Sequence, residues 1–292
     1  MMERLCNPCP MNKILACLRI MRPLNAVIAF AGIFVAGLIA GAVPARFPAL
    51  ALAALAGALV GAAGNILNDI RDVEVDRINK PRRVLPSALL TMREAWIWGG
   101  VCAAGGIAAG YGVSPLLGTV ASISALLVGL YDVLLKNLPV IGNAVVSLLV
   151  GTAFVFGAAS AGNAAAGIVP GIFGFLYTFG REVVKDVEDM EGDRAAGAAT
   201  LPIAFGIPAA RRLATGAFLL LVLGSFVPYV AGEYNLLYLA AVVPGVDALA
   251  AYVIVRLWKD DSRENFRRMS ALLKIGMPLG IAALYLGTVT IG

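Results

Sequence analysis

Long runs without a charged residue constrain the fold of this chain more than any other feature. Such runs cover residues 23–45, 47–68, 95–131, 137–180, 213–232 and 275–292. A transmembrane helix needs roughly 20 consecutive apolar residues. Of the 292 residues, 60% are hydrophobic and only 14% are charged, which is far from the composition of a soluble domain. The sequence therefore predicts an all-α, polytopic membrane protein.

The two longest runs are each predicted to form two helices, because both contain helix-breaking stretches. Residues 110–115 read Gly-Tyr-Gly-Val-Ser-Pro, and residues 160–167 are small and polar. Residues 234–255 join into one span across the single charge of Asp247. The prediction is nine transmembrane helices around a central cavity, over residues 24–43, 48–68, 94–112, 116–135, 139–159, 167–187, 212–231, 235–256 and 273–291.

The distribution of basic residues predicts the orientation, since cytoplasmic segments of membrane proteins are rich in Lys and Arg. If the N-terminus is cytoplasmic, every Lys and Arg except Arg46 falls in an inner segment of this nine-span topology. We expect a multi-pass protein of the cell membrane with a cytoplasmic N-terminus. The net charge of +5 then reflects membrane orientation and contacts with membrane lipids, not nucleic-acid binding.

Residues 1–292 are interpreted as a single membrane-embedded domain whose first ten residues form a disordered tail. The Cys6 and Cys9 pair within that tail has no second pair and no histidine to complete a metal site. Nothing in the sequence indicates an obligate protein partner.

An acidic pattern occurs twice. Residues 69–77 (Asp-Ile-Arg-Asp-Val-Glu-Val-Asp-Arg) and 186–194 (Asp-Val-Glu-Asp-Met-Glu-Gly-Asp-Arg) agree at five of nine positions. Each copy lies at the inner end of a predicted span, so both lie on the same face of the membrane and can converge. A solvated helix end with local ion pairs is the alternative interpretation, but solvated charge needs no fixed period.

The spacing of these acids predicts rows of oxygen ligands. Residues four apart lie on one side of a helix, which aligns Asn68, Asp72 and Asp76, and in the second copy Asp189 and Asp193, with Asp186 one turn earlier. The chain has no histidine, and carboxylate and amide oxygens favour Mg²⁺ over Zn²⁺ or copper. Because Mg²⁺ binds through a few carboxylates and substrate phosphates, two facing rows predict a bound diphosphate.

Basic residues at the same membrane boundary are candidate partners of the phosphate oxygens. Arg181 and Lys185 interleave with the second acidic row and are expected to point into its cavity. Others, such as Arg263, are interpreted as orientation signals. The candidate phosphate ligands are Arg22, Arg71, Arg77, Lys80, Arg82, Arg83, Lys136, Arg181 and Lys185.

These motifs resemble those of the UbiA superfamily of intramembrane prenyltransferases over nearly the whole chain. Residues 68–76 match its Asn-x-x-x-Asp-x-x-x-Asp motif, and residues 189–193 match its second motif, Asp-x-x-x-Asp. Residues 22–25 (Arg-Pro-Leu-Asn) and 131–136 (Tyr-Asp-Val-Leu-Leu-Lys) are similar to further family landmarks. The resemblance implies catalytic roles for Asn68, Asp72, Asp76, Asp189 and Asp193, and substrate contacts for Arg22, Asn25, Tyr131 and Lys136.

Within the family, residues 78–81 (Ile-Asn-Lys-Pro) and 180–193 are most similar to archaeal ether-lipid synthases. The resemblance implies Mg²⁺-dependent transfer of a geranylgeranyl group from its diphosphate to the glycerol C2 hydroxyl of geranylgeranylglyceryl phosphate. The aromatic faces of Tyr131 and Tyr177 are candidates to stabilise the allylic cation. Residues 83–88 (Arg-Val-Leu-Pro-Ser-Ala) depart from the Arg-Pro-Ile-Pro-Ser-Gly common in relatives.

Two alternatives stay open at this point. The acceptor could be aromatic, such as 4-hydroxybenzoate or a naphthoate, because the diphosphate motifs would be shared. A divalent-cation transporter is disfavoured, because transporters bind ions near the membrane midplane. Of the acidic residues, only Asp247 is expected at that depth, with a structural hydrogen bond or a place in the substrate cavity as its two candidate roles.

Overall fold

The computed structural model describes residues 10–136 and 138–289, and the described residues form helices and no strand. Cys6 and Cys9, and all of the predicted N-terminal tail except Pro10, lie outside the described residues. Pro10 begins a helix, α1 (Pro10–Ile20). Cys17 and Cys102 are free thiols.

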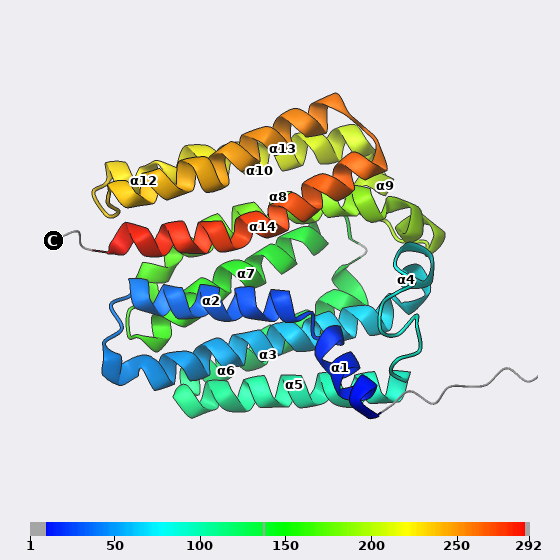
Figure 1. Ribbon diagram of the computed structural model, residues 1–292, viewed down its shortest axis with the longest axis horizontal. Coiled ribbons are helices and arrows are strands. Elements are labelled where there is room, and N and C mark those ends of the chain that lie inside the picture. Colours follow the sequence, from blue (N-terminus) through cyan, green and yellow to red (C-terminus); the bar gives the residue numbers. More distant parts are fainter. Residues whose placement is uncertain (1–9, 137, 290–292) are drawn as a thin grey trace, which may run out of the picture.

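Each predicted span corresponds to a long helix or to helical segments in series (Figure 1). The long helices are α2 (Pro23–Ile39), α3 (Phe47–Arg71), α5 (Met92–Val113), α6 (Pro115–Leu130), α7 (Ile141–Ser160), α8 (Ile168–Ala195), α10 (Ile207–Ser225), α13 (Ala248–Lys259) and α14 (Arg263–Thr288). The short segments are η1 (Pro44–Arg46), α4 (Val73–Asn79), η2 (Tyr131–Leu135), η3 (Ala164–Gly167), α9 (Leu201–Phe205), α11 (Val227–Val230), α12 (Leu236–Val242) and η4 (Val243–Asp247).

Seven of the described helical segments are long and apolar enough to cross a membrane, or eight if a bent pair counts as one span. The pair consists of Lys13–Ile20 and Pro23–Ile39, which meet at 51°. α8 is not among the seven, and its C-terminal half carries the second acidic motif. The chain is thus an all-α, multi-pass membrane protein.

Local sequence signals determine where several helices begin. Thr91 and Glu94 form a reciprocal capping box at the start of α5. Ser114 caps α6, and Pro115 occupies its first turn, where a missing N–H costs nothing. α14 begins at Arg263, ten residues before the predicted span, because the helix continues out of the apolar segment with Ser262 as its cap.

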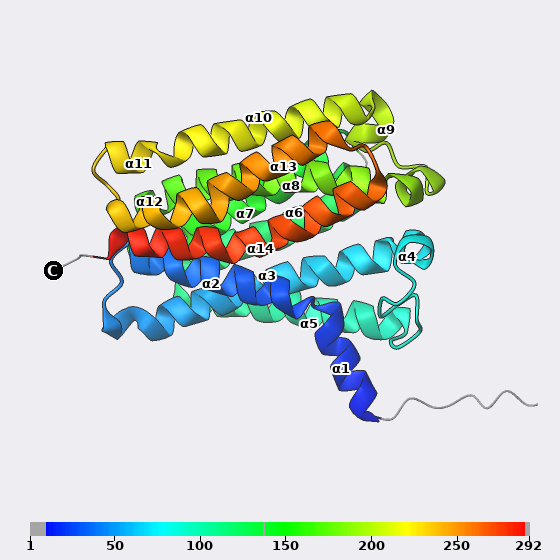
Figure 2. The ribbon, with the colours of Figure 1, turned by 45° about the horizontal axis from the view of Figure 1, so that its top comes forward.

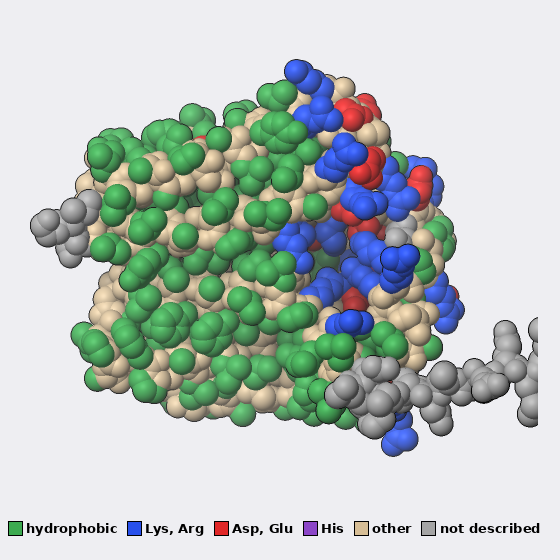
Figure 3. Space-filling view, viewed as in Figure 1, with side chains coloured by type: hydrophobic (Ala, Val, Ile, Leu, Met, Phe, Trp, Pro, Cys, Tyr) green, Lys and Arg blue, Asp and Glu red, His purple; other side chains and the backbone are tan. Residues whose placement is uncertain are grey.

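The long helices run side by side, and the short helices α4 and α9 lie together at one end of the bundle (Figures 1 and 2). We call this the charged end; it comprises α4, α9, the end of α8 and the start of α14. Figure 3 shows the Lys, Arg, Asp and Glu side chains of one face gathered there, while hydrophobic side chains cover the rest of that face. This division is expected of a helical bundle with one end outside the bilayer.

Glycine permits close packing between helices of the bundle. A Cβ atom on Gly157 of α7 would lie 2.1 Å from the backbone oxygen of Ile33 on α2, so only glycine fits there. Gly61 of α3, by contrast, has nothing within 4 Å of its Cβ position and lines the interior cavity described below.

Candidate active site

The first acidic motif lies where α3 meets α4. The expectation of one continuous helix is wrong, because α3 ends at Arg71 and Asp72 lies between the two helices. The predicted spacing nevertheless survives: the Asp72 N–H donates to the Asn68 carbonyl at 2.9 Å, and the Asp76 N–H to the Asp72 carbonyl at 2.7 Å. α4 is thus attached to α3 with the four-residue spacing intact.

Cations hold the carboxylates of this motif. Lys136 forms an ion pair with Asp72. Arg83 donates to Asp76 at 2.6 Å and to Asp69 at 3.1 Å. Asp69 and Asp76 are only 4% and 3% exposed, and carboxylates this deep require partners. The loop that follows α4 therefore folds back to neutralise the motif.

Arg22 connects the N-terminal segment to the first motif. It forms an ion pair with Asp69 and donates to the Asn68 side chain at 3.1 Å. Its backbone has φ 54° and ψ 72°, the left-handed conformation, at the bend before α2. This conformation is costly for a residue with a Cβ atom, and the two side-chain contacts fix it.

The second motif lies on the last turns of α8. Lys80, from the end of α4, donates to both carboxylate oxygens of Asp189 at 2.9 Å. Asn143 of α7 donates to Asp186 at 2.8 Å. Among the described residues, the Asp193 carboxylate has no hydrogen-bond or ion-pair partner, so both of its oxygens are free to coordinate a ligand. Through its ion pair with Asp189, Lys80 connects the segment that carries the first motif to the second motif.

Both motifs line one narrow pocket of about 40 Å³. The two acidic rows therefore face a common space, as their spacing and position indicated. The motif residues that line it are Asn68, Asp72, Asp76, Asp186, Asp189 and Asp193, together with Lys80, Arg83, Lys136 and Lys185.

The donor set of the narrow pocket suits Mg²⁺, since it offers carboxylate and amide oxygens and no histidine or thiol. Among the described residues, no three carboxylates are already grouped closely enough to hold a metal ion. Lys80, Lys136 and Arg83 occupy several of their oxygens instead. Metal binding therefore requires some of these cations to turn away from the carboxylates, which leaves them available to phosphate oxygens.

The pKa values of Asp76 on α4 and of Arg83 in the loop after it reflect this pairing. Burial raises the pKa of Asp76, although the guanidinium of Arg83 acts in the opposite direction. For Arg83, burial alone would lower the pKa, but the carboxylates of Asp69 and Asp76 raise it overall. Arg83 thus stays charged and neutralises Asp76, and it shares the neutralisation of Asp69 with Arg22.

Replacing Arg83 by Gln is expected to destabilise the protein by about 3 kcal/mol, because it leaves Asp76 buried without an ion-pair partner, while Asp69 keeps its ion pair with Arg22. Thermal unfolding of the purified protein in detergent measures the loss. Arg82→Gln is the matched control, since Arg82 is exposed. Adding Asp76→Asn to Arg83→Gln should recover part of the stability. Equal melting temperatures for wild type and Arg83→Gln would contradict the role of Arg83 in neutralising buried carboxylates.

The narrow pocket adjoins a much larger cavity of about 710 Å³ inside the bundle. Asn68, Lys80, Arg83, Tyr131, Glu182 and Lys185 line both spaces. Below this shared rim the large cavity is walled mainly by apolar side chains of α2, α3, α6, α7, α8 and α14. A polar head group at the rim and an apolar chain below it fit this arrangement.

All the predicted substrate-contact residues line one of these two spaces. Arg22, Asn25, Tyr131, Tyr177, Arg181 and Lys185 line the large cavity, and Lys136 lines the narrow pocket. Three further candidate phosphate ligands, Arg71, Arg77 and Arg82, line neither; Arg77 pairs with Glu74 on the exposed side of α4.

Tyr177 contacts its surroundings in a way that the sequence did not indicate. Its hydroxyl donates to the backbone oxygen of Leu273 on α14 at 2.5 Å, and its ring meets Phe218 edge to face. A Cβ on Gly276 would lie 2.1 Å from that hydroxyl. Tyr177 therefore connects α8 to α14 through a hydrogen bond, and the same side chain also lines the large cavity.

Several residues of the site were missed from sequence. Asp132, 5% exposed, accepts a hydrogen bond from Asn68, and Glu182 pairs with Arg181 at 2.6 Å and with Lys185 at 3.5 Å. Lys274 lines the large cavity from α14. The available signal for each was a charge close to the end of an apolar run. Arg263, interpreted as an orientation signal, donates to the Glu188 carbonyl and to Glu191, next to the second motif.

Asp247 is buried in η4 and accepts a hydrogen bond from Ser225 at 2.9 Å. Ser225 and Tyr238 line the large cavity, but Asp247 itself does not. The geometry therefore supports a structural hydrogen-bonding role for Asp247 over a place in the substrate cavity.

Comparison with known proteins identifies the class. The UbiA prenyltransferase family matches residues 27–277, and this chain belongs to that family. A digeranylgeranylglyceryl phosphate synthase of Methanothermobacter thermautotrophicus is 35% identical over 274 residues, which cover 94% of this chain and 96% of that protein.

Two solved structures are similar in fold. A structure described as giving insights into digeranylgeranylglyceryl phosphate synthase in membranes is 31% identical, covers 94% of this chain and 98% of its own, and has a TM-score of 0.73. A UbiA homologue from Archaeoglobus fulgidus bound to DMAPP and Mg²⁺ has a TM-score of 0.62, with 92% and 98% of the two chains covered. Its identity is 20%, so it is evidence of a shared fold alone.

Proposed function

We propose that this protein transfers a geranylgeranyl group from geranylgeranyl diphosphate to the C2 hydroxyl of geranylgeranylglyceryl phosphate and releases diphosphate. The observation that carries the proposal is a pocket of facing carboxylates and cations that opens into a large apolar cavity. A full-length relative that bears the name of this activity, at 35% identity, supports the choice of substrates. No observation favours an aromatic acceptor or ion transport.

The residues of the narrow pocket would hold the diphosphate and its metal. Mg²⁺, when bound, supplies neutralisation of the negative charge on the departing diphosphate. The oxygen ligands that we assign to it are Asn68, Asp72, Asp76, Asp186, Asp189 and Asp193. Lys80, Lys136 and Arg83 exchange carboxylate partners for phosphate oxygens, which places donors where charge develops.

The large cavity protects the allylic carbon as its bond to the diphosphate breaks. Its apolar walls exclude water, which would otherwise capture the cation. Tyr131 lies on the rim shared by both spaces, where its ring can face the cationic carbon. Tyr177 contributes mainly by fixing α14. The acceptor hydroxyl then attacks the carbon, so that the new ether bond replaces the bond to diphosphate. The hydroxyl proton passes to the released diphosphate or to a carboxylate of the narrow pocket.

The direct test uses purified protein in detergent with both substrates and Mg²⁺, and mass spectrometry of the lipid products. We expect a glyceryl phosphate that carries two geranylgeranyl ethers. Release of geranylgeraniol without that product would overturn the proposal.

We further propose that residues 1–292 form one membrane-embedded domain, with α8 as a ninth span and the charged end in the cytoplasm. The location of nearly all Lys and Arg at that end supports this orientation. Single cysteines at exposed Glu74 and Glu233, in a variant without native cysteines, test it. Glu74→Cys should react with an impermeant thiol reagent only after cells are opened, and Glu233→Cys in intact cells. The reverse pattern would contradict the orientation.

A further inference from the structure

Lys274 is a cation in the cavity wall that the proposed metal chemistry does not use. It is half-buried on α14 and lines the large cavity but not the narrow pocket. Within the described part of the chain its ammonium group makes no hydrogen bond or ion pair. The charged groups close enough to act on it are Arg181, Arg22 and Arg83, all of them cations.

Such an arrangement is unfavourable unless an anion balances the charge of Lys274. An ammonium group in an apolar wall loses hydration, and no carboxylate compensates Lys274 while neighbouring cations repel it. Every cation around the narrow pocket, by contrast, has a carboxylate partner: Lys80 with Asp189, Arg83 with Asp76, and Lys136 with Asp72. Lys274 is therefore positioned for an anion that arrives with a ligand.

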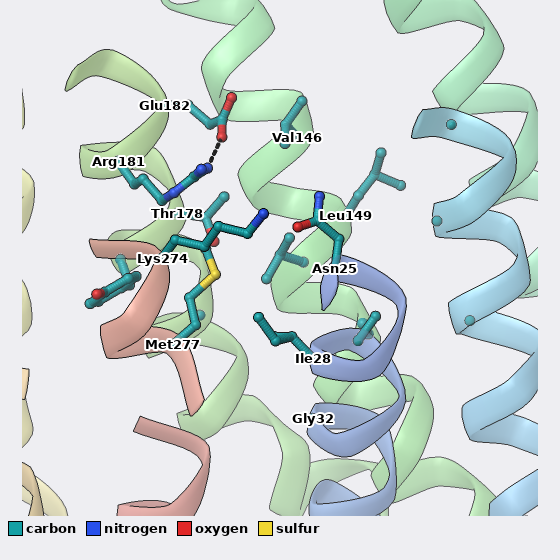
Figure 4. A pocket seen from close by; sticks show the side chains of 18 of the residues that line it. Asn25, Ile28, Gly32, Val146, Leu149, Thr178, Arg181, Glu182, Lys274 and Met277 are labelled. Atoms are coloured by element: carbon teal, nitrogen blue, oxygen red, sulfur yellow. Dashed lines mark hydrogen bonds and ion pairs between the residues drawn. The ribbon is translucent and has the colours of Figure 1, made fainter. Parts of the chain in front are cut away.

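The donors around Lys274 converge from three helices. Figure 4 shows its side chain reaching from α14 across the cavity toward Asn25 of α2, with Thr178 and Arg181 of α8 nearby. Nη1 of Arg181 donates a hydrogen bond to Glu182, but Nε of Arg181 is buried without a hydrogen-bond partner. These side chains line only the large cavity. They form a second group of hydrogen-bond donors that can bind an anion, and this group is separate from the narrow pocket.

We propose that Lys274 and Arg181 bind the phosphate of the glyceryl phosphate acceptor, with Asn25 and Thr178 as further hydrogen-bond partners. The inference rests on the proposed function. Two substrates with anionic head groups need separate sites, because their phosphates repel each other, and a free ammonium with three donors suits a phosphate. The acceptor's phosphate is held on the α8–α14 side of the cavity, while the diphosphate lies against the two acidic motifs.

Steady-state kinetics of Lys274→Gln in detergent, with Mg²⁺, test the assignment. We expect the KM for geranylgeranylglyceryl phosphate to rise about 10- to 100-fold, as for loss of a charge-assisted contact. The KM for geranylgeranyl diphosphate should stay unchanged. Geranylgeranylglycerol, which lacks the phosphate, should be a poor acceptor for wild type and no poorer for the variant. Lys274→Arg should retain most of the affinity.

Lys259→Gln is the matched control, since Lys259 is exposed at the end of α13 and lines neither space. Equal KM values for the phosphorylated acceptor in wild type and Lys274→Gln would overturn the inference and leave the proposed function standing. An equal rise in KM for both acceptors would also overturn it, because the effect would not depend on the phosphate. Failure of wild type to use the phosphorylated acceptor would overturn the proposed function and, with it, this assignment.

Discussion

Replacing Asp193 by Asn is expected to lower kcat for prenyl transfer by about 100-fold or more, the scale of losing a group that stabilises charge in the transition state. The substitution keeps the volume of the side chain and removes the charge that binds the metal. Asp193 lines the narrow pocket and pairs with no cation. Its replacement therefore leaves no cation without an ion-pair partner, and the protein should stay folded.

Asp72→Asn is expected to cause a similar loss of turnover, with a different effect on stability. Asp72 pairs with Lys136, so this variant leaves a cation unpaired and should melt at a somewhat lower temperature than Asp193→Asn. Glu233→Gln, an exposed acid between α11 and α12, is the control for loss of a carboxylate as such. Full transfer activity in both aspartate variants would mean that the acidic motifs are solvated helix ends.

Removal of Mg²⁺ with EDTA is expected to reduce transfer below about one hundredth of its initial rate, because the departing diphosphate loses its main source of charge neutralisation. Readdition of Mg²⁺ should restore the rate. The protein should remain folded without the metal, since Lys80, Lys136 and Arg83 already neutralise Asp189, Asp72 and Asp76. Transfer that continues at an undiminished rate in EDTA would contradict the assigned role of the carboxylates.

The positions of the helices within the apolar segments were predictable, because the apolar runs and their breakers are local signals, although in the described part of the chain only seven or eight of the nine predicted spans are long and apolar enough to cross a membrane. The break after Gly110 became the junction of α5 and α6 at Ser114, and each remaining predicted span contains a helix. The helix ends were less predictable where charged residues continue a helix beyond the bilayer. α14 starts at Arg263 and α8 reaches Ala195, because a helix needs an apolar surface only where lipid surrounds it.

The acidic motifs were predictable because a repeat with a four-residue spacing is visible in a single sequence. Their partners were not, since these depend on contacts between distant segments. Lys80 and Asp189 are 109 residues apart, and Lys136 and Asp72 are 64 apart. No local pattern specifies such pairs. The break between α3 and α4 was also hidden, because Val73 and Glu74 are compatible with a continuous helix.

The position of Lys274 in the cavity was also not predictable from the sequence. In the sequence it is a charge beside an apolar run, like the residues that set membrane orientation. Only the folded bundle reveals that it lies in a cavity with cations as its charged neighbours. The difference between an orientation signal and a ligand-binding cation depends on which side of the helix faces the interior.

The measurement that tests the central claim most directly is a competition among acceptors. Purified protein receives geranylgeranyl diphosphate and Mg²⁺ together with equal concentrations of geranylgeranylglyceryl phosphate, 4-hydroxybenzoate and a naphthoate, and mass spectrometry identifies the products. We predict that the glyceryl phosphate with two geranylgeranyl ethers is the dominant product and that it is absent with Asp193→Asn. A prenylated aromatic acid as the dominant product would contradict the account.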